Sequence, residues 1–238
     1  MGQRKREQAE INGGVILYIG ISLFTAAAVA AAGIMIVKKR FKNEVKYSPK
    51  TGHIFLIVSL TVFAAFGTAL PLLANAEDWT LFSVLRTLSV LCWTYFAGVI
   101  DLKLKIIPNE LVIGMLIELT VISAAEAICD FSGFKSVIIS SLLGGLAMGV
   151  IFLLGRALSK GGMGMGDVKL VLMCGLFLGF ENVIGMVFWA LVFSVITGIV
   201  LMSAKKAKLK TKLPMGPFFF AGALVSNTIY IISGLNGG

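Results

Sequence analysis

The sequence predicts an all-α polytopic membrane protein, and three properties of its composition lead to this prediction. Hydrophobic residues make up 58% of the 238 residues and charged residues only 14%, whereas about a quarter of an ordinary globular chain is charged. The mean hydropathy is +0.95. A soluble body of this size cannot hide so many apolar side chains. The composition therefore excludes a disordered chain, a disulfide scaffold, a coiled coil and a soluble nucleic-acid-binding domain.

Eight apolar segments are candidates for membrane spans. A bilayer core of about 30 Å needs about 20 residues of helix, and continuous apolarity without alternation favours helices over barrel strands. The predicted spans are 15–37, 54–75, 81–100, 109–128, 136–158, 168–180, 183–203 and 216–234. We expect one membrane-embedded domain over residues 1–238, with a polar tail at 1–14 and a short cytoplasmic loop at 38–53.

The first span is not interpreted as a cleavable signal peptide. Its apolar run, 15–37, is longer than the apolar region of a typical signal peptide. Lys38, Lys39 and Arg40 follow it as a stop-transfer pattern. We therefore expect this segment to remain as the first transmembrane helix.

Small residues in the fifth span predict close helix packing. Gly144, Gly145 and Gly149 give a small-xxx-small spacing within 136–158, which allows two helix backbones to approach each other. We interpret these glycines as packing residues rather than as part of a reactive site.

The sixth span is too short to cross a bilayer alone. Residues 168–180 would rise only about 20 Å as a helix. A glycine-rich stretch at 161–166 precedes Asp167 just before this span. We expect this stretch to break the chain before the sixth helix and to enter the membrane from the cytoplasm, surrounded by protein.

Charged loops predict the orientation. The first, third, fifth and seventh loops carry most of the lysines, whereas the opposite loops carry Lys135 and the acidic Glu77, Asp78 and Glu181. By the positive-inside rule the odd-numbered loops are cytoplasmic. This predicts a multi-pass protein of the inner or plasma membrane with both termini outside, even though the basic segment 4–6 then lies outside as well.

Charged residues within the spans have structural interpretations as well as functional ones. Arg86 is expected to extend toward the membrane surface or to pair with Glu77 or Asp78. Glu118 and Glu126 either face a wet groove or form packed hydrogen bonds.

Missing motifs exclude several chemistries. The chain has no HExxH motif and His53 is its only histidine, so a zinc protease has no ligands. No serine lies in a GxSxG motif, and the glycines at 161–166 lack the ending of a phosphate-binding loop. Cys92, Cys129 and Cys174 lie far apart and are interpreted as small buried apolar residues. We expect no metal and no cofactor.

Two aspartates remain as candidate catalytic residues. Asp101 lies at the end of the third span and Asp167 follows the glycine-rich stretch. Ionisable groups at membrane depth are costly and therefore functional candidates. Two neighbouring carboxylates share a proton, so one can act as a base on water while the other acts as an acid toward a peptide carbonyl. Alternatively, each aspartate caps a helix or pairs with a lysine.

Three motifs together resemble the type IV prepilin peptidase family, whose members are membrane aspartic proteases of the GxGD kind. Asp101 is followed by Ile107-Pro108-Asn109, then by the segment 162–170 with its GMGD sequence, and then by Pro214-Met215-Gly216-Pro217-Phe218. The resemblance implies that Asp101 and Asp167 are the catalytic pair. The supporting motif residues are Pro108, Gly164, Gly166, Lys169, Pro214, Gly216 and Pro217.

The resemblance also implies substrates and partners. These are prepilins or pseudopilins, cut at the cytoplasmic membrane face at the end of a short basic leader, in type IV pilus or protein secretion systems. The partners are thus the substrate and membrane lipid, with no nucleic acid. Asn109 stands where the family often has aspartate, and Lys169 either orients substrate, counters the charge of Asp167 or extends toward the cytoplasm.

One departure from the family pattern is informative. Bifunctional members carry paired CxxC motifs in a domain of the first loop that methylates the new N-terminus. The loop at 38–53 contains no cysteine. We therefore expect a short form with peptidase activity and without N-methyltransferase activity.

Two alternatives use the same carboxylates. A presenilin or signal-peptide-peptidase relative has Tyr-Asp before GxGD and Pro-Ala-Leu after it, but here Ile100 precedes Asp101 and Ala69-Leu70-Pro71-Leu72 precedes both aspartates. A small transporter with paired carboxylates predicts two related halves. The glycine-rich stretch has no counterpart in residues 1–120, which disfavours the transporter.

Overall fold

All regular structure in the described part of the chain is helical. The computed structural model describes residues 20–21, 25, 27–39, 81–159, 162–205 and 213–236. Residues 27–39 are helical, and the labelled helices are α3 (Leu81–Leu104), α4 (Asn109–Cys129), α5 (Phe131–Leu158), α6 (Met165–Ser203) and α7 (Gly216–Asn236). The first four of these labelled helices are long and apolar enough to cross a membrane. The prediction of an all-α membrane protein is therefore confirmed for the described residues.

The predicted number of eight spans is tested only in part. The second span, 54–75, lies outside the described residues, as does most of the first half of the span 15–37. The predicted tail at 1–14 and loop at 38–53 also lie outside them, apart from two residues at the start of the loop. The count of eight therefore stays a prediction.

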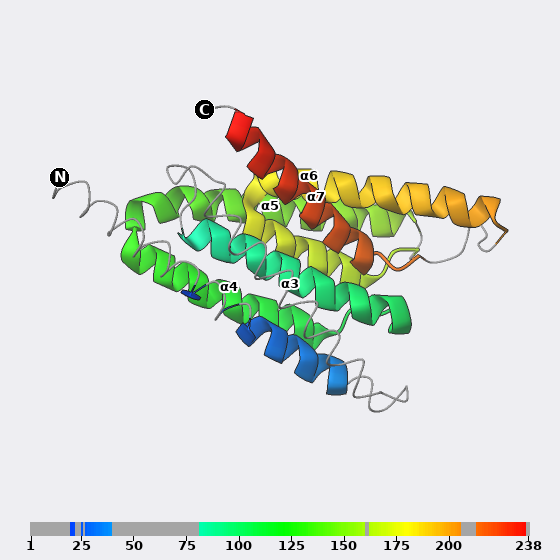
Figure 1. The fold of residues 1–238 in the computed structure, drawn as a ribbon, viewed down its shortest axis with the longest axis horizontal. Coiled ribbons are helices and arrows are strands. Elements are labelled where there is room, and N and C mark those ends of the chain that lie inside the picture. The colour runs from blue at the N-terminus through cyan, green and yellow to red at the C-terminus, as the bar shows by residue number, and fades with distance from the viewer. Residues whose placement is uncertain are drawn as a thin grey trace, which may run out of the picture.

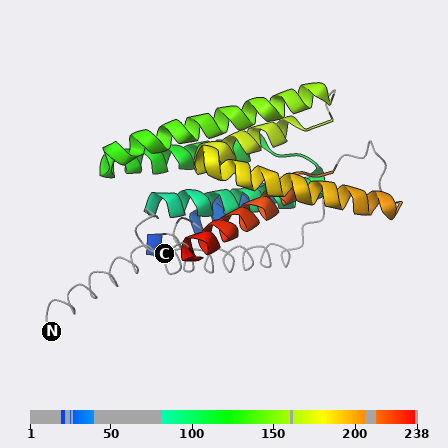
Figure 2. The ribbon, with the colours of Figure 1, turned by 90° about the horizontal axis from the view of Figure 1, so that it is seen from above.

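The helices form a bundle in which α6 is central to the packing. It packs most extensively against α5 and α7, and α3 packs mainly against α7. Figure 1 shows α3 and α4 side by side, with α5, α6 and α7 across them. Figure 2, seen from above, shows α5 along one edge of the bundle and α7 near the opposite edge.

Helix α6 consists of two helical segments that meet at Gly179. The backbone there is non-helical, with φ 76° and ψ 177°, a conformation that glycine adopts more easily than other residues. The segment 165–178 packs against α5, because added Cβ atoms at Gly145 and Gly149 would meet Leu172 and Leu176. The two segments cover the positions of the predicted sixth and seventh spans, although the first begins at residue 165 rather than 168.

The second segment of α6 returns toward the end of the bundle where the first began. Contacts between Gly185 and Ser226 and between Gly198 and Leu213 make it antiparallel to α7. Figure 1 shows this orange part of α6 finishing near the start of α7. The chain thus reverses at Gly179, although residues 162–164 before α6 are non-helical as well. The membrane depth of the glycine-rich stretch stays a prediction.

The backbone groups freed at this reversal have partners from other helices. The carbonyl of Leu176 accepts a hydrogen bond from Arg86 Nη1 at 3.4 Å, and the N–H of Phe180 donates to Ser140 Oγ at 3.1 Å. Backbone polar groups in a bilayer must be satisfied within the protein. The predicted packing role of Gly144 is confirmed, since an added Cβ would lie 2.7 Å from the Gly179 carbonyl carbon.

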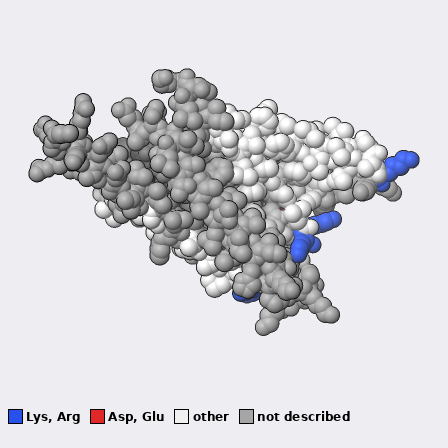
Figure 3. Space-filling model, viewed as in Figure 1, with Lys and Arg blue, Asp and Glu red and all other residues white. Residues whose placement is uncertain are grey.

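The surface of the bundle suits lipid. Large apolar side chains on α4 and α5 are exposed, among them Ile113, Ile117, Val121, Ile139 and Leu146. Figure 3 shows a face on which the described residues display no acidic side chain and on which lysines and arginines lie toward one end. That end is where α6 finishes and α7 begins (Figure 1).

Candidate active site

Asp101 lies in the last turn of α3 and is nearly buried, with 5% of its surface exposed. Its Oδ2 accepts a hydrogen bond from the backbone N–H of Gly216 at 2.9 Å, and the backbone of Met215 donates to the same carboxyl group. The first N–H groups of a helix have no partner within it and carry partial positive charge. The N-terminus of α7 is therefore a binding site for the Asp101 carboxylate.

Close backbone packing of α3 and α7 makes this hydrogen bond possible. An added Cβ at Gly216 would lie 2.9 Å from Gly98 Cα, and one at Gly98 would lie 3.1 Å from the Pro217 backbone. Larger side chains at either glycine would push the helices apart. The sequence motif that contains Pro214, Gly216 and Pro217 thus holds a donor against Asp101.

Asp167 lies in the first turn of α6. Its Oδ2 accepts a hydrogen bond from the N–H of Gly164 at 3.1 Å, at the N-cap of the helix. A carboxylate in this position is stabilised by the helix dipole. The prediction that Asp167 stands at the N-terminal end of the sixth helix is confirmed, although this helix begins at residue 165 rather than 168. The capping interpretation is correct for this residue, and it leaves the other carboxylate oxygen available for chemistry.

The turn between α3 and α4 brings the two aspartates together. An added Cβ at Gly166 would lie 2.8 Å from Ile107 Cβ, so the start of α6 packs directly on this turn. Pro108 is the N-cap residue of α4. The carboxylates of Asp101 and Asp167 are close enough to interact electrostatically. Residues 66 positions apart in the chain therefore share one site.

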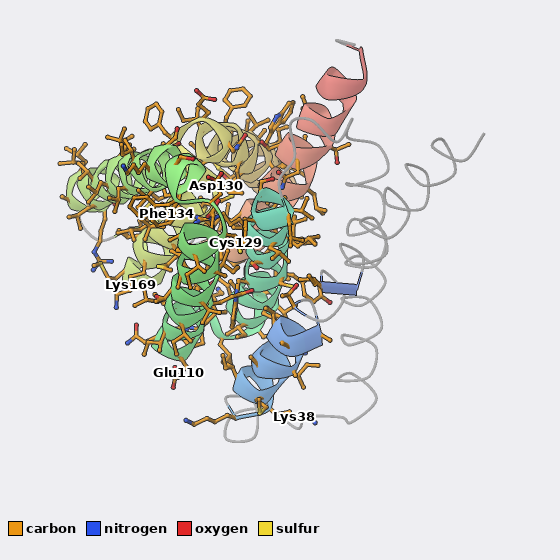
Figure 4. The ribbon with its side chains drawn as sticks, turned by 90° about the vertical axis from the view of Figure 1, so that its left-hand side faces the viewer. Lys38, Glu110, Cys129, Asp130, Phe134 and Lys169 are labelled. Atoms are coloured by element: carbon orange, nitrogen blue, oxygen red, sulfur yellow. The ribbon has the colours of Figure 1, made fainter. Side chains whose placement is uncertain are left out.

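Polar side chains fix the start of α6 from two sides. Lys169 Nζ donates to Asn109 Oδ1 at 2.9 Å, which ties α6 to the first turn of α4. Figure 4 shows Lys169 and Glu110 projecting from the same side of the bundle. Arg156 Nη1 donates to the carbonyl of Met163 at 2.6 Å and so ties the glycine-rich connection to α5. Neither interaction was predicted from the sequence, because Arg156 belongs to a basic loop and Asn109 to a motif, and neither feature indicates a hydrogen-bond partner.

Two of the three glutamates of α4, Glu118 and Glu126, lie outside this site. Glu118 accepts hydrogen bonds from Ser89 Oγ at 2.6 Å and from Trp93 Nε1. Glu126 forms a buried ion pair with Arg86 at 2.8 Å. Their hydrogen-bonded structural interpretation is therefore confirmed, and neither carboxylate contacts an aspartate of the site in the described residues.

The structure corrects the interpretation of Arg86. This side chain does not extend toward the membrane surface, since only 4% of the residue is exposed. It also donates to Ser123 Oγ at 3.0 Å and to Ser141 Oγ at 3.4 Å. The predicted partners Glu77 and Asp78 lie outside the described residues. Within the described residues Arg86 pairs with Glu126 of α4, a helix packed beside α3.

Chemically, the site offers two carboxylates and several backbone donors. Among the described residues no group of three or more histidine, cysteine, aspartate or glutamate side chains could hold a metal ion. Cys92 and Cys174 are buried whereas Cys129 is exposed, so the prediction of burial holds for two of the three cysteines. Paired carboxylates are suited to general acid and base catalysis by way of water.

Comparison with known proteins gives one match. Residues 88–199 match the model of the type IV leader peptidase family. This range contains both aspartates, the turn between α3 and α4 and the glycine-rich connection, and it ends before the start of α7. No curated protein and no solved structure matched the chain.

Proposed function

Because residues 88–199 match the model of the type IV leader peptidase family, we propose that the chain is an aspartic endopeptidase that removes the short basic leader from prepilin or pseudopilin-like substrates. In this proposal Asp101 and Asp167 are the catalytic pair. The family match supports a peptidase; the choice of residues and substrate rests on the site.

One observation carries the proposal. Two aspartates from separate helices, α3 and α6, share one electrostatic site at the end of a membrane bundle. Two carboxylates whose charges interact favour a state in which the pair holds one proton. A carboxylate with a purely structural role in a membrane protein is instead expected to interact with cations or hydrogen-bond donors and not with a second carboxylate.

The proposed reaction uses both protonation states of the pair. The ionised carboxylate accepts a proton from a water molecule as the water oxygen attacks the peptide carbonyl. The protonated carboxylic acid donates its proton to the carbonyl oxygen, which gives a neutral tetrahedral intermediate. As the intermediate collapses, the carboxyl group that took the water proton gives it to the leaving nitrogen and the C–N bond breaks. The other carboxylate takes a proton from a hydroxyl of the intermediate as the new carboxyl group forms, so the pair again holds one proton.

The site's position suits a substrate with a polar leader and an apolar helix. Lys103, Arg156, Lys169 and Lys205 lie at the same end of the bundle as the aspartates, which the positive-inside rule assigns to the cytoplasm. A leader in the cytoplasm and an apolar helix in lipid would place the scissile bond between them. This arrangement favours a cut near the membrane surface over a cut in the middle of a transmembrane helix.

The test is cleavage by the purified protein in lipid nanodiscs of a prepilin carrying a basic leader. Mass spectrometry should find one new N-terminus, at the junction between the leader and the apolar segment. The matched control is the Asp167→Asn protein at equal concentration. Cleavage within the apolar helix would favour a presenilin-like protease, and intact substrate under all conditions would contradict the proposal.

Orientation is tested separately by cysteine labelling in a protein lacking its three native cysteines. Lys103→Cys and Ser132→Cys place single thiols at opposite ends of the bundle, and both positions are exposed. A membrane-impermeant maleimide should label position 132 in intact cells and position 103 only in inverted vesicles. The reverse pattern would contradict a cytoplasmic active site.

A further inference from the structure

A second polar site lies at the end of the bundle opposite the aspartates. It is a cavity of about 250 Å³ formed between α3, α5, α6 and α7. The polar residues that line it include Arg86, Ser136, Ser140, Asn182 and Asn227. Ser136 and Asn182 are exposed at its mouth, whereas Arg86 and Asn227 are buried. Figure 4 looks onto this end of the bundle, where Cys129 and Asp130 link α4 to α5.

Two buried donors on residues that line this cavity have no acceptor among the described residues. They are Nε of Arg86 and Nδ2 of Asn227, on residues that are 4% and 7% exposed. Buried N–H groups are almost always hydrogen-bonded, since an unmet donor costs free energy. Two such donors from separate helices in one cavity indicate a ligand that supplies acceptor oxygens.

The charge of the cavity restricts the ligand further. The Nη2 atom of Arg86 already pairs with Glu126, and Nη1 donates to the carbonyl of Leu176 and to Ser141. Only the Nε edge of the guanidinium is left for a ligand. Because Glu126 already balances the charge of Arg86, the cavity has no further positive charge to neutralise an anion with two or more charges. A group with one negative charge spread over two acceptor oxygens matches the two unmet donors.

The position of the cavity in the bundle indicates which group with one negative charge it binds. Its lining residues belong to the first two turns of α3, the N-terminal part of α5 and the reversal at Gly179. In a membrane this end of the bundle lies near an interface, where lipid headgroups gather. Basic pockets between transmembrane helices bind lipid headgroups in other proteins, and Arg86 is the basic residue that lines this one. A volume of about 250 Å³ has room for a headgroup and not for acyl chains as well.

We propose that this cavity binds the phosphodiester headgroup of a membrane phospholipid. The oxygens of the phosphodiester accept hydrogen bonds from Arg86 and Asn227, and serine hydroxyls at the mouth contact the rest of the headgroup. The bound lipid would join α3, α6 and α7 where α6 reverses. This site is separate from the proposed peptidase site, and its existence does not depend on that activity.

The experiment measures the unfolding temperature of the full chain, purified and delipidated in maltoside detergent, with increasing phosphatidylglycerol. We expect a saturable increase of several degrees and one retained lipid by native mass spectrometry. Diacylglycerol with the same acyl chains has no phosphate and should give no increase. Inorganic phosphate tests for a free anion, and an increase as large as that from the lipid would overturn the headgroup assignment.

Two variants of α7 connect the effect to the cavity. Asn227→Leu removes one unmet donor and leaves the Arg86–Glu126 pair intact, so the variant should fold. The lipid concentration needed for half of the increase in unfolding temperature should rise at least tenfold. Thr228→Val is the matched control: its hydroxyl bonds the carbonyl of Leu224 and the residue does not line the cavity. An equal lipid response in Asn227→Leu and the parent protein, or no response in the parent, would overturn the proposal.

Discussion

Two polar regions lie at opposite ends of α3, and they differ in whether the interacting charges are opposite or alike. Arg86 and Asp101 are 15 residues apart on this helix, or about 22 Å at 1.5 Å per residue. Arg86 pairs with an opposite charge, Glu126, and its remaining Nη donors reach hydroxyls and a backbone carbonyl. Asp101 interacts with a like charge, Asp167, and its carboxylate accepts hydrogen bonds from the backbone at the N-terminus of α7.

This difference teaches that a buried charge in a membrane protein does not by itself identify a reactive site. An opposite charge together with hydroxyl and carbonyl partners stabilises a local structure, in this case the reversal of α6 at Gly179. A pair of like charges stabilises little, because each carboxylate opposes ionisation of the other. Such a pair is expected at a site of proton transfer, where one carboxylate accepts a proton and the other donates one. Both regions can be altered to test the contrast.

The largest expected effect is on cleavage, from altering the like-charged pair. Asp101→Asn and Asp167→Asn each should lower the rate by about 1,000-fold or more, because acid and base act as a unit. The amide oxygen still accepts from Gly216 or Gly164, so the unfolding temperature should stay close to that of the parent. Rates are measured with the prepilin substrate in nanodiscs. Parent-like rates in either variant at equal expression would disprove the catalytic assignment.

Breaking the opposite-charge pair should instead affect stability. Glu126→Leu leaves the Arg86 guanidinium buried without its counter-charge, which should cost about 3–5 kcal/mol. The double variant Arg86→Met with Glu126→Leu should recover part of this loss. Reversible unfolding in mixed micelles measures both. If the double variant loses more unfolding free energy than the two single variants lose together, the pairing is contradicted.

A smaller loss of stability is expected at the reversal itself. Gly179→Ala would force a Cβ into a backbone with φ 76° and to within 2.7 Å of Ser140 Oγ, at a cost of about 1–3 kcal/mol. Gly155→Ala is the matched control, because an added Cβ there meets nothing within 4 Å and alanine favours a helix. The unfolding temperature should fall for the first variant only. A comparable fall in both would show that strain at Gly179 is not the cause.

The smallest effect is expected from a half-buried carboxylate, Glu118, that belongs to neither pair. Glu118→Gln keeps an oxygen that can accept from Ser89 or Trp93, and Glu118 does not contact the aspartates. Cleavage should remain close to the parent rate, with a modest decrease in unfolding temperature. A loss of cleavage as large as that of Asp167→Asn would place Glu118 in the catalytic machinery.

Several features of this protein follow from the sequence alone. Apolar run lengths predict the helices now seen as α3, α4, α5 and α7 to within a few residues, because transfer into lipid depends on local composition. Glu181 and Asn182 interrupt the apolar run and place a boundary near the reversal at Gly179. The three motifs also identify Asp101 and Asp167 as a candidate pair. All of these depend on residues that are neighbours in the chain.

The partners of the polar groups were decided by the tertiary structure. Arg86 and Glu126 are 40 residues apart, and Lys169 and Asn109 are 60 apart. Only the packing of α3, α4 and α6 determines which of many possible partners each side chain meets. Hydropathy describes how a segment divides between water and lipid, whereas a hydrogen bond depends on the position of two atoms within a few tenths of an ångström. For that reason the sequence predicted the helices and the candidate catalytic residues, and the folded bundle determined what holds them in place.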